Sequence, residues 1–413
     1  MPQVNKLRTA LSGERGGDTA PPSSARLRAA LAVFFALDGF LFAGWVVRIP
    51  AIKHQTGASA STLGLALLGV SAGAVITMML TGRLCRRYGS HAVTVVCGVL
   101  LSLSIALPAQ TGSALALGLV LLAFGAAYGG LNVAMNSAAV DLVSALRRPV
   151  MPSFHAAFSF GGMAGAGIGG LVAGSLSPAT HLFALTGLGL LVTAVTAVTA
   201  PVLLRGRPAA PAAELPAADA PDRPKGMGSR ARRIVVLFGV IALCTAYGEG
   251  ALAEWGALHL SQDLGATPGL AAAGYSLFAL TMAIGRLTGT ALLERFGQTR
   301  TLVAGGATAA AGMLLGALAP AVWLVLLGFA VAGLGLANIF PVAVGRAGAL
   351  AGPSGVAAAS TLGYGGMLLG PPVIGFLADW ISLPVALTTV TLLAATAAVL
   401  GWTARNAGEH PND

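Results

Sequence analysis

The sequence predicts an all-α membrane protein with twelve transmembrane helices arranged as two six-helix repeats. Of its 413 residues, 56% are hydrophobic and only 9% are charged, whereas soluble domains carry about 25% charged residues. The apolar residues form continuous runs of about 20 residues, the length at which a helix crosses a bilayer. They do not alternate with polar residues as they would in a β-barrel. A proline-rich polar segment divides these runs into six and six.

The apolar runs define the expected elements in order. The first six lie near residues 29–49, 61–82, 91–109, 113–137, 153–175 and 181–204. The second six lie near residues 234–256, 270–293, 301–319, 321–343, 355–378 and 384–404. The expected domains are a disordered cytoplasmic tail (1–28), an N-terminal half (29–204), a cytoplasmic linker (205–233), a C-terminal half (234–404) and a second cytoplasmic tail (405–413). Five prolines prevent the linker from forming a packed element.

Short sequence matches relate the two halves to each other. Four pairs occur in the same order, at offsets between 204 and 210 residues. They are Ala43-Gly44-Trp45 with Ala253-Glu254-Trp255, Arg87-Tyr88-Gly89 with Arg295-Phe296-Gly297, Leu121-Leu122-Ala123-Phe124 with Leu326-Leu327-Gly328-Phe329, and Phe160-Gly161-Gly162-Met163 with Tyr364-Gly365-Gly366-Met367. Parallel repeats of six spans are typical of transporters, whose substrate site lies near the membrane midplane between the halves.

The net charge of +10 is concentrated in a few connections. Lys and Arg gather in the N-terminal tail and at residues 83–87, 147–148, 205–233 and 295–300. The positive-inside rule places these segments, and both termini, on the cytoplasmic side of the cytoplasmic membrane, next to lipid head groups. The connections expected on the opposite side contain only one such residue, Lys53, with Arg48 at the end of the first run. Arg48 is expected to reach outward to the membrane interface. The charge therefore reflects topology, and no basic domain for nucleic acid is present.

The sequence contains no signal for a metal, a cofactor or a catalytic residue. The three cysteines have no metal-binding or disulfide spacing. A phosphate-binding loop of the ATPase type is also missing. An ion gradient, rather than ATP, is therefore the expected energy source.

Two acids interrupt apolar runs in which a carboxylate costs several kcal/mol, roughly, unless it has a partner or faces water. Asp38 lies in the first run and Glu249 in the seventh, at nearly the same depth in the two halves. A carboxyl group removed from water holds its proton more tightly, so both are candidates for proton coupling. The alternative is a structural acid bonded to a neighbouring helix. Tyr247 and Tyr275 are candidate hydrogen-bond partners of Glu249, while Glu254 is expected at the interface.

Other polar side chains in the spans are candidates for substrate binding. Asn132 and Asn136 are four residues apart and therefore share one helix face. Asn338, His155 and Tyr364 complete this set, with Tyr247 and Tyr275. Hydrogen bonding between helices remains an alternative for the asparagines and His155, and packing for Tyr364.

Together, these motifs resemble the major facilitator superfamily over essentially the whole length. Gly285-Arg286-x-x-Gly289 and Glu294-Arg295-Phe296-Gly297 match its cytoplasmic loop signature, as do Gly82, Arg87 and Gly89. Arg86 stands where the family usually has an aspartate. Trp45-Val-Val-Arg48-Ile-Pro50, Met151-Pro-x-Phe-His155, Glu249-Gly250 and Gly370-Pro371-Pro372 resemble a bacterial branch near the fucose-permease-like facilitators.

The resemblance implies a monomeric secondary transporter that moves a small organic solute by alternating access, with spans 1, 4, 7 and 10 lining the central site. It implies that Arg286 forms a cytoplasmic gate with Glu294 or Asp141, together with Arg295 and Arg87; binding of an anionic substrate is the alternative role for Arg286. The drug-exporter glycine–proline signature is absent from span 5, which favours proton symport. A proton-antiporting exporter and a non-transporting membrane sensor are the other hypotheses.

Overall fold

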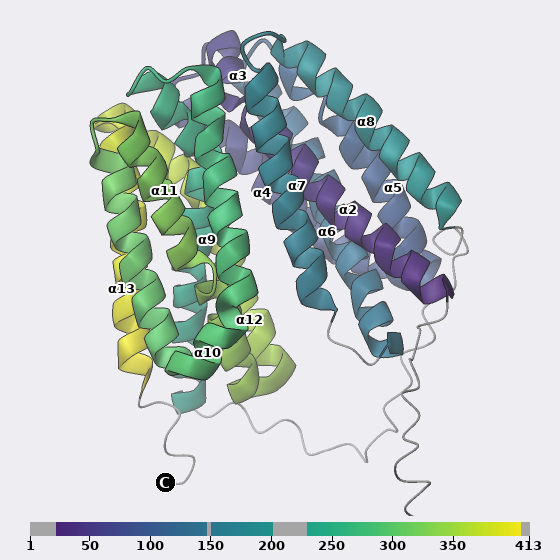
Figure 1. The fold of residues 1–413 in the computed structure, drawn as a ribbon, viewed down its shortest axis with the longest axis vertical. Coiled ribbons are helices and arrows are strands. Elements are labelled where there is room, and N and C mark those ends of the chain that lie inside the picture. The colour runs from purple at the N-terminus through teal and green to yellow at the C-terminus, as the bar shows by residue number, and fades with distance from the viewer. Residues whose placement is uncertain (1–21, 147–149, 201–228, 406–413) are drawn as a thin grey trace, which may run out of the picture.

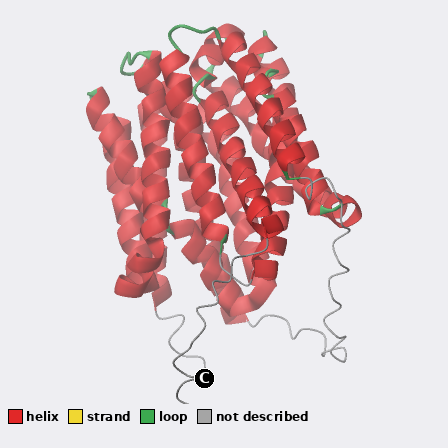
Figure 2. Cartoon of the chain, turned by 45° about the vertical axis from the view of Figure 1, so that its right-hand side comes forward, coloured by secondary structure: helices red, strands yellow, loops and turns green. Residues whose placement is uncertain are grey.

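A computed structural model describes residues 22–146, 150–200 and 229–405, and every regular element in these ranges is a helix (Figure 2). The N-terminal half contains α2 (Pro22–Val46), α3 (Ile49–Thr56), α4 (Ala60–Tyr88), α5 (Ser90–Ser104), the short 3-10 helix η1 (Pro108–Gln110), α6 (Ala114–Leu146), α7 (Met151–Val172) and α8 (Pro178–Thr199). The C-terminal half contains α9 (Ser229–Gln262), α10 (Pro268–Leu318), α11 (Val322–Leu336), α12 (Ile339–Trp380) and α13 (Leu383–Thr403). Most of the expected tails and linker lies outside the described residues.

The described helices account for the twelve expected spans. Ten segments are long and apolar enough to cross a membrane. One of them, α10, consists of two helices joined at Gly297, where φ is 75° and ψ is 166°. The 22-residue helix α7, which packs against α2 and α10, completes the set.

Two of the spans are interrupted, which the apolar runs alone did not predict. The first span breaks between α2 and α3, and the tenth breaks between α11 and α12. Pro50 and Pro341 lie in the first turn after these breaks. Because proline has no N–H, it cannot donate to the carbonyl four residues earlier, and its ring disfavours a continuous helix there.

The repeat detected in the sequence is also present in the backbone. Gly89 and Gly297 end the second and eighth spans with φ of 88° and 75°, values that favour glycine because it lacks a Cβ. In each segment an arginine lies over the ring of the aromatic residue that follows it, 5.2 Å from the centroid at Tyr88 and 5.5 Å at Phe296. The two loops therefore have the same local structure.

The two halves contact each other toward the end of the bundle that carries α3, which we call the upper end (top of Figure 1), and their ribbons diverge toward the lower end. Asp379 of α12 accepts hydrogen bonds from the backbone N–H groups of Ala60 and Ser61 at the start of α4, at 2.9 and 2.8 Å. Deeper in the bundle, Ser71 donates to the carbonyl of Met367 at 3.3 Å. A negative charge stabilises the N-terminus of a helix, so Asp379 clamps α4 to the other half.

Prolines and glycines make this contact possible. Pro371 has no N–H, so the carbonyl of Met367, four residues earlier, is free to accept from the other half. Gly64 of α4 lies directly against the carbonyl group of Pro371, and Gly375 lies against the carbonyl of Ala60. Small residues at these points let the helix backbones approach closely, as in other membrane bundles.

Arg48 corrects one expectation, because it does not reach outward to the interface. Its side chain is only 2% exposed, and its Nε donates to Nδ1 of His181 at 2.8 Å. The two Nη atoms donate to the carbonyls of Val172, Ala173 and Leu176 at 3.1 to 3.4 Å. These carbonyls lie at and just after the C-terminal end of α7, where a cation is favoured. The carbonyl of Val172 also accepts from the backbone N–H groups of Ser175 and Leu176.

We expect Arg48→Met to destabilise the N-terminal half by about 2–4 kcal/mol, because it removes the donors to the buried Nδ1 of His181 and to the carbonyls of Ala173 and Leu176. Thermal unfolding of the purified protein in detergent measures this loss. Lys53→Met is the control, since Lys53 makes only a 3.5 Å contact with Gln262. Equal melting temperatures for the two variants would show that the Arg48 bonds contribute little.

Candidate functional site

Polar side chains from helices of both halves gather at one site inside the bundle. The hydroxyl of Tyr128 on α6 lies within electrostatic range of Asp38, Glu249, Tyr275 and Tyr364. His155 on α7 lies within electrostatic range of Arg286 on α10. We call the seven residues the central cluster: Asp38, Tyr128, His155, Glu249, Tyr275, Arg286 and Tyr364.

Asp38 is the most unusual member of the central cluster. Its side chain is fully buried in α2, at 0% exposure, and neither carboxyl oxygen has a hydrogen-bond partner among the described residues. An isolated ionised carboxylate would be very costly in such a position. The arrangement therefore fits a protonated, neutral Asp38.

Glu249 has a different environment from Asp38, although the repeat places the two at similar depth. Its Oε2 and Oε1 atoms lie 3.2 and 3.4 Å from one nitrogen, Nη2, of Arg286. The two side chains are 28% and 30% exposed, respectively. One half therefore presents a buried neutral acid and the other an accessible ion pair.

The partner of Arg286 differs from the gate expected from the family resemblance. Arg286 pairs with Glu249, whereas Asp141 accepts a hydrogen bond from Ser90 at 3.0 Å and Glu294 is exposed. The eighth span continues to Gly297, so Arg286 lies 11 residues, or about 16 Å, before its end. This depth matches Glu249 and not the loop. Arg87 and Arg295 are also exposed, and each contacts its neighbouring aromatic ring as described above.

The two tyrosines expected beside Glu249 have different positions. Tyr247 is directed away, and its hydroxyl shares a 2.9 Å hydrogen bond with Thr389 of α13. Tyr275 is buried and interacts electrostatically with both Glu249 and Arg286. Residues four apart in a helix share one face, whereas residues two apart do not. Tyr247 and Glu249 therefore face different neighbours.

The asparagines take part in hydrogen bonds within and between helices. Asn136 donates to the backbone carbonyl of Asn132 at 2.8 Å and lies 3.4 Å from its side-chain oxygen, so the two share a face as expected. Asn338 donates to the carbonyl of Gly285 at 2.8 Å and ties the break after α11 to α10. The bond of Asn338 matches the structural alternative.

Sequence reasoning missed Tyr128, which joins the two halves of the cluster. Its ring stacks on Phe42 at 5.1 Å and on Phe124 at 6.4 Å. The only sequence signal was its position four residues after Phe124 and four before Asn132, on one face of α6. Glu254, expected at the interface, is instead buried at 8% exposure, and its Oε2 has no partner among the described residues.

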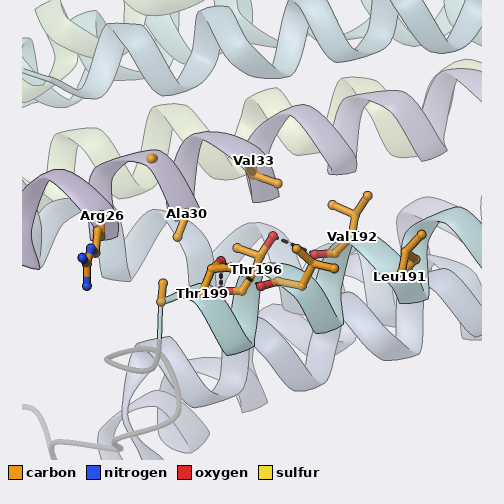
Figure 3. A pocket seen from close by; sticks show the side chains of 10 residues that line it. Arg26, Ala30, Val33, Leu191, Val192, Thr196 and Thr199 are labelled. Atoms are coloured by element: carbon orange, nitrogen blue, oxygen red, sulfur yellow. Dashed lines mark hydrogen bonds between the residues drawn. The ribbon is translucent and has the colours of Figure 1, made fainter.

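A separate groove of about 590 Å³ lies between α2 and α8. Figure 3 shows Arg26 at one end and apolar side chains such as Val33 and Leu191 along it. The hydroxyls of Thr196 and Thr199 are bonded to carbonyls of their own helix. The groove is thus apolar apart from Arg26 and shares no residue with the central cluster. No metal-binding group of three His, Cys, Asp or Glu side chains occurs within the described ranges.

Comparisons with known proteins agree with this architecture. The family model described as the Major Facilitator Superfamily matches residues 29–257 and 238–413. An uncharacterised MFS-type transporter of Yersinia pestis is 32% identical, over 92% of this chain and 95% of that protein.

Two solved structures have a similar fold. A bacterial homologue of the human lysosomal transporter Spinster, in an inward-facing and unoccupied conformation, has a TM-score of 0.75 at 14% identity, over 94% of this chain and 98% of that one. The fucose:proton symporter of E. coli has a TM-score of 0.57 at 19% identity, over 91% and 97%.

The family match spans nearly the whole chain, and its members are transporters rather than enzymes. The expected fold and family are therefore confirmed. The chain belongs to the major facilitator superfamily, as a multi-pass membrane transporter of small molecules.

Proposed function

We propose that this transporter is a proton-coupled symporter of a small polar organic solute, working as a monomer in the cytoplasmic membrane. The observation that carries the proposal is the complete burial of Asp38, whose carboxyl group has no hydrogen-bond partner among the described residues. A neutral carboxyl group tolerates this state and a charged one does not. Proton uptake at Asp38 would therefore favour the arrangement described above, and proton release would follow when water reaches the group.

The charge distribution supports a cytoplasmic lower end. Arg83, Arg86 and Arg87 lie at the lower end of α4, and Arg295 lies beside the lower break in α10. Because positive residues concentrate on the cytoplasmic side, contact between the halves at the upper end corresponds to an inward-open state. Both termini are then cytoplasmic, and alternating access requires the upper contacts to separate.

The outer surface of the bundle supports contact with membrane lipids. Large apolar side chains are exposed around it, including Leu115 at 76%, Leu171 at 85% and Val198 at 73%. A soluble monomer rarely exposes so much contiguous apolar surface, whereas lipid tails solvate it.

The proposal is tested in proteoliposomes with an imposed pH gradient. Ligands are first found by thermal shift against classes of metabolites, since a ligand that binds only the native state raises its stability. We expect such a ligand to accumulate against its concentration gradient when the interior of the proteoliposomes is alkaline. A protonophore should abolish this accumulation.

The direction of the gradient separates the hypotheses. Accumulation driven only by an acidic interior would indicate a proton-antiporting exporter and would overturn symport. Accumulation that follows a sodium gradient and ignores pH would overturn proton coupling altogether.

A further inference from the structure

We infer that the transported solute is a small organic anion, whose carboxylate or similar oxyanion binds Arg286 in place of Glu249. This inference rests on the proposed transport function and adds the substrate class to it. It starts from the way in which Arg286 is bonded in the central cluster.

The ion pair leaves most of the Arg286 guanidinium unused. Both contacts with Glu249 come from Nη2, at 3.2 and 3.4 Å, whereas a strong charge-assisted bond is about 2.7–2.9 Å long. Within the described ranges, Nε and Nη1 make no hydrogen bond to another side chain or carbonyl. The side chain is 30% exposed. A guanidinium offers five donors in a planar fork that suits two oxygens of one oxyanion.

Among the groups around Arg286, only the Glu249 carboxylate balances its positive charge. Glu249 faces Arg286 and Tyr275 from α10 and interacts with Tyr128 from α6. His155 of α7 and Tyr364 of α12 complete the surroundings. Asp38, the other acid of the central cluster, is buried and fits its neutral form. When Glu249 takes up a proton, the Arg286 charge is no longer balanced by protein. An anion then restores neutrality.

The organic part of the solute meets aromatic and hydroxyl groups. Tyr364 is 38% exposed, and Tyr275 lies beside Phe278, with ring centroids 6.2 Å apart. These phenol groups present both an apolar face and a hydrogen-bonding tip. A bare inorganic anion would use only Arg286, whereas an organic acid uses the rings as well.

The exchange of one anion for one charge on Glu249 links solute binding to proton uptake at this site. Asp38, whose protonation is proposed above to favour the inward-open arrangement, takes no part in the exchange. One proton moves from water to the Glu249 carboxylate, and one solute carboxylate takes its place at Arg286. The loaded site carries the same net charge as the empty one, so the central helices can rearrange without carrying an extra buried charge. Binding of the anion should therefore strengthen as pH falls.

The test uses a panel of small carboxylic acids, each paired with its primary amide, which keeps the skeleton and removes the charge. Binding is measured by calorimetry on the purified protein at several pH values. We expect acids to bind and amides to fail. If one proton is taken up with each anion, the affinity for the acid rises by up to about tenfold for each unit by which the pH falls. Arg286→Gln should weaken acid binding by at least about 30-fold. Arg346→Gln is the matched control, because Arg346 lies over Phe238 outside the central cluster.

Glu249→Gln keeps the test decisive if Arg286→Gln does not fold. This variant mimics the protonated acid, so we expect it to bind the same acids with no pH slope. Equal binding of acids and amides, or a preserved pH slope in Glu249→Gln, would overturn the inference. Acid binding without gradient-driven uptake would instead refute symport and leave the anion site intact. Proton-driven uptake of an uncharged or cationic solute that is unaffected by Arg286→Gln would refute the anion site and leave proton symport intact.

Discussion

Asp38→Asn is expected to abolish accumulation driven by a proton gradient while exchange of solute across the membrane continues. The amide has nearly the same shape as the carboxylic acid, but it cannot release a proton. Exchange of solute needs only the states in which solute and proton are bound. Accumulation also needs the proton to be released on the side where the proton concentration is low. Counterflow and gradient-driven uptake in the same proteoliposomes separate these two activities.

Asp263→Asn is the matched control for Asp38→Asn. Asp263 forms a 2.8 Å pair with His259 near the end of α9, outside the central cluster. We expect its uptake and pH profile to resemble those of the unaltered protein. If Asp38→Asn still accumulated solute with a normal pH profile, Asp38 would not be a coupling group.

Gly64→Val is expected to prevent closure of the upper end and to reduce transport by at least about tenfold, since a population shift of that size needs only about 1.4 kcal/mol. A Cβ at Gly64 would collide with the carbonyl of Pro371 and lie 3.2 Å from Cα of Pro372. These are backbone atoms, which cannot rotate away as a side chain can. The halves must therefore separate at the upper end, which favours the outward-open arrangement.

Spin labels on cysteines at Lys53 and Gln262 report this separation, because the two side chains meet across the halves at 3.5 Å. The three native cysteines are buried and do not compete for label. Gly187→Val is the control, since a Cβ at Gly187 has no heavy atom within 4 Å. An unchanged distance distribution and a normal transport rate in Gly64→Val would refute the proposed role of this contact.

The contrast between Asp38 and Glu249 shows how far sequence reasoning reached. The apolar runs and the repeat located both acids in spans and at similar depth. They did not distinguish Asp38, a buried acid with no hydrogen-bond partner in the described part of the chain, from Glu249, an accessible acid paired with Arg286. The rotation of each helix decides this difference, and a span that is apolar on most faces contains little signal for rotation.

Arg286 and Arg48 illustrate the same limit for cations. Several carboxylates were compatible with Arg286 because the expected end of the eighth span was short by several residues. Arg48 was assigned to the interface because a long cationic side chain usually reaches water. The ends of α7 and α8 were needed to show that carbonyls and His181 surround it instead.

The number of spans, the two-half repeat, the family and the types of residue at the centre could all be predicted from the sequence. These follow from local physics, because a bilayer requires each crossing segment to satisfy its own backbone hydrogen bonds and to be apolar over a fixed length. Which polar groups come together depends on the packing of the helices. Packing pairs Glu249 with Arg286 and Asp379 with the start of α4, and it brings Tyr128 within electrostatic range of both acids. Such contacts join segments up to 319 residues apart, and they depend on helix rotation and packing that no local pattern encodes.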